Sequence, residues 1–201
     1  MALFHRYLQR RGLDIQQQER LTDCILDWLT PGNIPRLNGA KADGAYQPPG
    51  RGFFVSVDEL AMIKGSQPLV SQPGWQDDFT IYSDPPQIDL QSAPLRILEC
   101  LPNVGELNAT RLLKVRQGPD GLDGTADDHI FSSISEAFSY LNIVPNSPQA
   151  QLLAAFVALN NPLNSIIRIK STGQCGNISR LSEVVARKAG MQPIVLSWKE
   201  L

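Results

Sequence analysis

The chain has 201 residues, of which 42% are hydrophobic and 19% charged, and its formal net charge is −2. This length allows one large domain or two small ones, and the composition is that of a soluble globular protein. Lys and Arg form no run, which argues against a polyanionic partner, and no apolar stretch is long enough for a membrane span or a signal peptide. The sequence therefore indicates either a cytoplasmic protein or one whose targeting segment is not part of this chain.

The first 31 residues predict two helices. Residues 3–10 carry apolar side chains on one side, and Asp14 can cap a second helix in which apolar residues repeat at helical spacing. Pro31 ends that helix, because proline cannot continue it.

Residues 30–52 contain four prolines and five glycines, which predicts a long loop. Ser56 and Glu59 then have the spacing of a capping box, so a third helix is expected from there to Gly65. Residues 66–86 are again rich in proline and predict no regular element.

Residues 92–116 predict two helices joined by a tight turn at 102–105. This arrangement resembles the helix-hairpin-helix unit of DNA-binding proteins, whose hairpin amides contact phosphates. Asn103 stands where the DNA-binding form usually has glycine, and Glu99 and Glu106 lie beside the few basic residues. Phosphate binding needs a positive surface, so a packing role is favoured over DNA binding.

Two further helices and a small sheet are expected after residue 130. Ser133 and Glu136 form a second capping box that opens a helix to Leu141, and Ser147-Pro148 begins another helix. From Asn164 the pattern changes to strands.

Ile167 and Ile169 alternate with Arg168 and Lys170, which is typical of a half-buried strand. Residues 173–176 predict a turn, and 178–188 and 194–198 complete an antiparallel meander. Three strands alone bury one face poorly, so the side with Ile194, Leu196 and Trp198 is expected to need a helix from upstream. Without that helix, an apolar face that includes some of these residues is expected to be exposed. The predicted fold class is α+β, with a mostly helical domain at 1–150 and the sheet at 151–201.

The segment Asp120–Asp128 packs four carboxylates and two glycines into one turn-forming loop. Calcium takes six to eight oxygen ligands, and glycines let the chain curl so that nearby ligands face one centre. The Asp-x-x-Asp-x-Thr-x-Asp-Asp spacing favours a calcium site over a solvated acidic turn, although the residue order of an EF-hand is missing.

No catalytic grouping is found, so the chain is expected not to be an enzyme. Its two histidines are His5 and His129, and His129 follows two aspartates that cannot easily converge with it on zinc, which favours a solvent-facing side chain. The three cysteines form no Cys-x-x-Cys pair. Burial as small apolar side chains is favoured for Cys24 and Cys100. One disulfide among Cys24, Cys100 and Cys175 remains an open alternative, and its pairing cannot be read from the sequence.

Several short motifs, in this order and spacing, resemble the type II secretion minor pseudopilin K family, also called general secretion pathway protein K, over essentially the whole chain. They are Asp27-Trp28-Leu29, Pro35-Arg36, Gly39-Ala40 with Asp43, Pro48-Pro49, Val57-Asp58-Glu59-Leu60, Lys64-Gly65, Ile88 to Pro94 and Val195-Leu196-Ser197-Trp198.

The resemblance implies a non-enzymatic subunit at the tip of the type II secretion pseudopilus, acting in assembly and in protein export across the outer membrane. Its partners would be minor pseudopilins I and J, with no nucleic acid. Its body would lie in the periplasm and be anchored in the inner membrane by an N-terminal helix. That helix and a first strand would precede the region matched here, so that Met1 would begin a soluble part of the protein.

The resemblance also implies a helical domain with a SAM-like helix-hairpin-helix unit, a pseudopilin-type sheet and bound calcium. Calcium is assigned to Asp120, Asp123, Asp127 and Asp128, with Thr125 contributing its carbonyl. The chain departs from the family at Lys41, which replaces a glutamate, so no second metal site is assigned to that loop. The alternative function is a helix-hairpin-helix nucleic-acid-binding protein, which salt-sensitive retention of DNA would favour.

Overall fold

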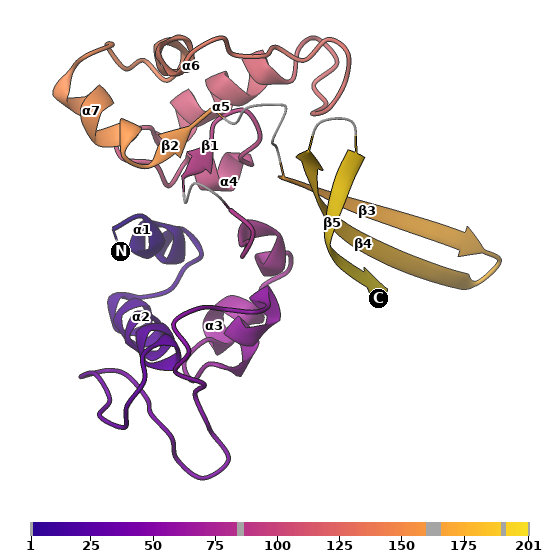
Figure 1. Cartoon of the computed structure of the whole chain (residues 1–201). Coiled ribbons are helices and arrows are strands. Elements are labelled where there is room, and N and C mark those ends of the chain that lie inside the picture. The colour runs from indigo at the N-terminus through magenta and orange to yellow at the C-terminus, as the bar shows by residue number, and fades with distance from the viewer. Residues whose placement is uncertain (1, 84–86, 160–165, 190–191, 201) are drawn as a thin grey trace. The chain divides into compact units, whose positions relative to one another are not determined.

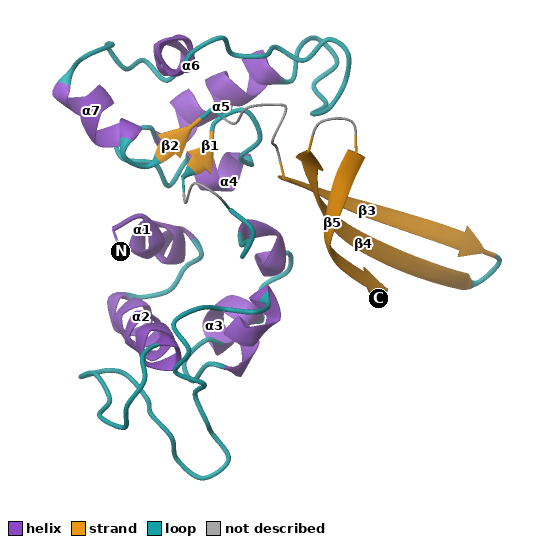
Figure 2. Cartoon of the chain, in the orientation of Figure 1, coloured by secondary structure: helices purple, strands orange, loops and turns teal. Residues whose placement is uncertain are grey.

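The computed structural model describes residues 2–83, 87–159, 166–189 and 192–200. Short helices and loops are followed by a three-stranded antiparallel sheet, which confirms the α+β class (Figures 1 and 2). The chain divides into two compact units, one of Met1–Ile81 with Pro94–Thr110 and the other of Tyr82–Ala93 with Arg111–Leu201. These units alternate along the sequence, whereas the sequence alone suggests one boundary at residue 150. No helix in the described part of the chain combines the length and apolarity needed to cross a bilayer.

The first two helices form as predicted, as α1 (Ala2–Arg10) and α2 (Ile15–Leu29). Asp14 caps α2, since its carboxylate accepts the Gln17 amide at 2.8 Å while the Gln17 side chain accepts the Asp14 amide at 3.0 Å. This reciprocal pair satisfies two backbone donors that a bare helix start would leave unpaired.

The third predicted helix has the wrong type, because Val57–Met62 forms the 3-10 helix η1. Ser56 caps it through the Asp58 amide, and the Glu59 carboxylate turns inward to accept the Trp28 indole N–H at 3.0 Å. The expected capping box is incomplete, because the Ser56 hydroxyl accepts the Asp58 amide instead of the Glu59 amide, while Glu59 also accepts the Val55 amide at 2.9 Å.

Residues 66–83, expected to be irregular, contain two helical turns, α3 (Gln67–Val70) and η2 (Trp75–Asp78). Leu69 and Trp75 are the buried side chains of these turns, so each turn is held by one anchor in the core.

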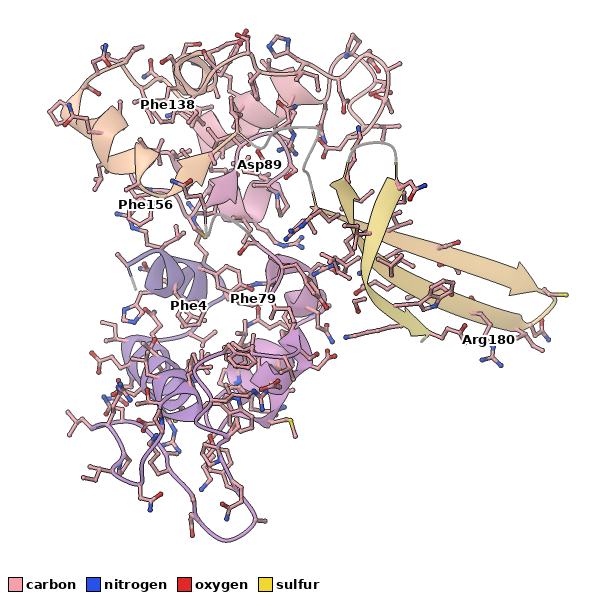
Figure 3. The ribbon with its side chains drawn as sticks, in the orientation of Figure 1. Phe4, Phe79, Asp89, Phe138, Phe156 and Arg180 are labelled. Atoms are coloured by element: carbon pink, nitrogen blue, oxygen red, sulfur yellow. The ribbon has the colours of Figure 1, made fainter. Side chains whose placement is uncertain are left out.

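The core of the first unit gathers side chains from α1, α2, η1 and both later turns. Phe4 and Phe79 meet edge to face at its border, with ring centroids 6.4 Å apart (Figure 3). Cys24 and Cys100 are buried free thiols, which confirms their predicted burial, and burial raises the pKa of Cys100 to about 11. The buried members are Tyr7, Leu8, Leu13, Leu21, Cys24, Trp28, Leu60, Ile63, Leu69, Trp75 and Cys100.

The predicted helix–turn–helix segment consists of α4 (Leu95–Leu98) and α5 (Gly105–Arg116). Helix α4 ends three residues before the expected Leu101. In the turn, Asn103 has φ of 59° and Gly105 has φ of 69°, and asparagine and glycine are the residues that tolerate this left-handed region best.

The second unit contains α6 (Ile134–Tyr140) and α7 (Pro148–Ala154), capped by Ser133 and Ser147 as predicted. It also contains a short parallel pair that the sequence does not predict, between β1 (Ile88–Asp89) and β2 (Val157–Ala158). The amide of Ile88 donates to the carbonyl of Phe156 at 2.8 Å.

The terminal sheet has the order β3-β4-β5, with β3 (Ile166–Cys175), β4 (Ile178–Ala189) and β5 (Gln192–Glu200). The antiparallel meander is confirmed, but the first turn is tighter than predicted because β3 continues to Cys175, paired with Ile178. Asn164, where the pattern changes in the sequence, lies outside the described residues.

Candidate functional site

The acidic loop connects α5 to α6, and its glycines determine its path. Gly118, Gly121 and Gly124 have φ values of 63°, 70° and 88°. A Cβ on Gly118 would lie 2.4 Å from the carbonyl oxygen of Asp127, so the chain can approach Asp127 only at a residue without a side chain.

The C-terminal end of the loop is held by Gln91, which follows β1 and which the sequence analysis did not single out. Its amide nitrogen donates to the His129 carbonyl at 2.9 Å, and its amide oxygen accepts the Phe131 amide at 3.0 Å. The His129 amide also donates to the Arg116 carbonyl at 2.9 Å. The two ends of the loop are therefore held together by backbone and amide bonds.

Three oxygens converge on the hydroxyl of Thr125. They are Asp127 Oδ1 at 2.8 Å, Asp128 Oδ1 at 3.2 Å and the Leu122 carbonyl at 3.4 Å. A hydroxyl has one proton to donate, so it can satisfy one of these three acceptors at a time. This cluster of oxygens is the part of the loop whose chemistry suits a hard cation.

The outer oxygens of the same carboxylates accept backbone amides. Asp127 Oδ2 accepts the Asp120 amide at 3.2 Å, and Asp128 Oδ2 accepts the Gly124 amide at 2.6 Å. The bond from Thr125 and the bond from the Asp120 amide lower the pKa of Asp127. Each of these side chains therefore has one oxygen held by a backbone amide and the other directed at the cluster.

The structure places Asp123 away from this cluster, against Arg116. Arg116 is 1% exposed, and its guanidinium forms two bonds with the Asp123 carboxylate, at 2.9 and 3.1 Å. The same guanidinium donates to the carbonyls of Ala93 and Leu90 at 2.8 and 3.3 Å. The sequence does indicate that Arg116 is buried, because it lies at an apolar position of the helical pattern. Its partner Asp123 was not predicted.

The five predicted ligands therefore separate into different environments. Thr125, Asp127 and Asp128 converge through their side chains, Asp120 contributes its amide, and Asp123 pairs with Arg116. In the described residues no three His, Cys, Asp or Glu side chains are grouped as a metal would require. The donor types fit calcium, whereas the number of converging oxygens is below the usual six to eight.

His129 keeps 40% of its side-chain surface exposed, in agreement with the predicted solvent-facing position, while the rest of its ring is packed. Its Nε2 lies 2.7 Å from Glu136 Oε1, and its ring meets Phe131 and Tyr140 edge to face. Ser132 donates its hydroxyl and amide to Glu136, and these bonds, with His129, lower the pKa of Glu136 to about 2.

One face of the terminal sheet is apolar and exposed. The register puts Ile167, Ala186 and Val195 in one row across the strands, and Ile169, Val184 and Trp198 in the next. Directly paired residues share a face, so these six residues form what we call the apolar sheet face. Its large side chains are open to solvent, with Trp198 65% and Ile169 49% exposed, whereas the small Ala186 is buried at 4%.

The predicted exposure of Ile194 and Trp198 is confirmed, but the two do not share a face. Val185 pairs with Ser197 and Ala186 with Val195, so Leu196 is an extra residue in β5. A bulge of one residue reverses the alternation of side chains. Ile194 consequently pairs with Arg187, on the face where Glu183 Oε1 and Oε2 lie 3.9 and 3.8 Å from Arg168 and Lys170.

The helix–turn–helix segment offers little positive charge to a phosphate backbone. Arg116 is buried and paired with Asp123, and Arg96 of α4 pairs with the buried Asp78. These partners neutralise two of the four basic residues on which DNA binding would depend.

No family model matches the sequence, and no curated protein matches it either. Among solved structures, the chain is similar to GspK in the crystal structure of the GspK-GspI-GspJ complex from the enterotoxigenic Escherichia coli type 2 secretion system. The TM-score is 0.70 at 11% sequence identity, and the match covers 100% of this chain and 69% of that chain. Over its whole length, this chain has the fold of the pseudopilin GspK.

Proposed function

We propose that this chain is a minor pseudopilin of a type II secretion system. The observation that carries the proposal is the likeness in fold over the whole chain to GspK, a protein solved in complex with GspI and GspJ. The expected partners are minor pseudopilins I and J. The expected role is non-enzymatic, in assembly of the pseudopilus tip and in protein export across the outer membrane.

The apolar sheet face supports a role in assembly. A contiguous apolar surface on a small sheet is unusual unless another element covers it. We propose that a helix packs on this face in the assembled protein, which would be periplasmic and anchored in the inner membrane by an N-terminal helix.

The test is assembly of the full-length protein with minor pseudopilins I and J of the same organism, measured by size-exclusion chromatography with light scattering. A stable complex of all three is expected, and Trp198→Asp should weaken it. Thr172→Asp is the matched control, because it adds the same charge to the opposite face of the sheet. A folded protein that forms no complex with either partner would contradict the proposal.

We further propose that calcium binds the acidic loop through Thr125, Asp127 and Asp128, with Asp120 beside them. The supporting observation is the convergence of three acceptors on one hydroxyl. In this proposal Asp123 stabilises the loop through Arg116 and is not a ligand. A bound cation would offset the repulsion between neighbouring carboxylates.

A further inference from the structure

The other long loop of the chain, 30–52, is built around a buried carboxylate. The side chain of Asp27, near the end of α2, has no exposed surface. Its Oδ2 accepts the Arg36 amide at 3.0 Å, and its Oδ1 accepts the Arg36 guanidinium at 2.7 Å. A Cβ on Gly39 would lie 2.0 Å from Oδ2, so the loop passes the carboxylate as closely as a backbone can.

Lys41 places its ammonium group among oxygens at the same point. Nζ donates to the Asp27 carbonyl at 2.8 Å and to the Thr30 carbonyl, and it lies 4.0 Å from Asp27 Oδ1. Lys41 is 8% exposed, which is unusual for a lysine. Main-chain carbonyls and a carboxylate are the ligands that a hard divalent cation also takes.

The loop pairs every carbonyl at the end of α2. Lys41 takes those of Asp27 and Thr30, while the amides of Gly50 and Gly52 donate to the carbonyls of Trp28 and Leu29 at 3.0 and 2.8 Å. Helix ends leave such carbonyls without intrahelical partners, and the negative end of the helix dipole favours a cation there. The Lys41 ammonium therefore joins the end of the helix to the loop.

We propose that the Lys41 ammonium occupies, among these oxygens, the position that a metal ion could take. Its positive charge then fixes the 30–52 loop without a metal. The competing explanation is that the aliphatic stem of Lys41 merely packs against the core. The two explanations predict different protection of the 30–52 loop when Lys41 is replaced by a neutral side chain of similar length. They also differ in what a carboxylate at position 41 should do, because only a group of oxygens that requires a cation would then recruit one from solution.

The test is hydrogen exchange in the 30–52 segment, measured by mass spectrometry on the whole chain with calcium or with chelator. In the parent chain, exchange in this segment should be the same in both conditions. Lys41→Met should exchange about tenfold faster in both, because charged hydrogen bonds to buried carbonyls are lost. Lys41→Glu should exchange faster with chelator and regain protection with calcium.

Lys114→Glu is the matched control, since it reverses the same charge at an exposed position of α5 and should leave the 30–52 segment unchanged. Parental exchange in Lys41→Met would show that the stem alone suffices, and would overturn the proposal. Calcium-dependent exchange of 30–52 in the parent would overturn it too, as would failure of calcium to protect a folded Lys41→Glu. The segment 117–130 is followed separately, so calcium binding there does not confuse the result.

Discussion

The loops 30–52 and 117–133 each follow a helix and contain several glycines, but they place their charges in opposite ways. In the first, one buried carboxylate, Asp27, is surrounded by groups of this chain, the Arg36 guanidinium and the Lys41 ammonium. In the second, a buried cation, Arg116, takes one carboxylate, while Asp127 and Asp128 gather around a hydroxyl. The first loop has an internal cation for its oxygens, whereas in the described part of the chain no cationic side chain bonds to the oxygen cluster of the second.

This difference predicts which loop should change its stability with the cations in solution. A loop that contains its own counter-charge is stabilised wherever the protein folds. A loop whose carboxylates face one another gains stability from any cation that binds only the folded state. Four changes would break or sharpen this comparison.

The largest effect is expected from Asp27→Ala. It leaves the ammonium of Lys41 buried beside carbonyls alone, and removing one partner of a buried pair costs about 3–5 kcal/mol. Urea unfolding followed by circular dichroism measures the loss. Asp120→Ala is the comparison in the other loop, because that carboxylate is exposed and accepts the Leu122 amide of the same loop. Equal losses in the two variants would show that burial of the charge does not separate the loops.

Arg116→Met should be next, at about 3 kcal/mol, because it leaves the carbonyls of Ala93 and Leu90 without their donor and each costs about 1–3 kcal/mol. Arg111→Met, one turn earlier on the exposed side of α5, should change the free energy of unfolding by less than about 0.5 kcal/mol. The same urea titration compares them. A small effect at Arg116 would mean that water replaces its bonds.

Calcium should stabilise the parent chain by about 2.7 kcal/mol at a hundredfold excess over its dissociation constant. Magnesium should do so poorly, because it demands strict octahedral geometry and loses water reluctantly. Thermal melting with calcium, magnesium or chelator checks this. Asp127→Asn and Asp128→Asn should abolish the calcium effect, whereas Asp43→Asn, in the other loop, should retain it. Identical melting of the parent in all three conditions would leave a solvated acidic turn.

The smallest effect concerns pH. Bonds from Ser132 and His129 depress the pKa of Glu136 to about 2, below its ordinary 4.5. The carboxylate therefore contributes stability above pH 4.5, and that contribution is lost as the pH falls toward 2. Glu136→Gln should flatten the dependence of unfolding on pH in this window. A parent and variant with parallel pH curves would contradict the assignment.

Local signals predicted the helix starts correctly, because a cap depends on residues three apart. Asp14, Ser133 and Ser147 all cap as expected. The strands of the sheet were predictable for a similar reason, since alternation is a short-range pattern. Ser56 shows the limit, because its partner Glu59 bonds to Trp28, which lies 31 residues earlier.

What the sequence could not predict depends on residues far apart in the chain. The pair β1–β2 joins two-residue strands about seventy positions apart, too short to leave a pattern. In the candidate site, the spacing identified the acidic loop, but the partner of Asp123 depends on a buried arginine and on carbonyls near residue 90. The single extra residue in β5 is also invisible in composition, although it decides which side chains share a face.

The extra residue Leu196 has a further consequence, which concerns the solubility of the protein. Strand β5 is at the edge of the described sheet, where unpaired backbone groups invite a strand of another molecule and lead to aggregation. A bulge twists and interrupts such an edge, and Pro193 removes an amide donor near its start. Deleting Leu196 would give a straighter edge beside an apolar surface, so the variant should precipitate at concentrations that the parent tolerates.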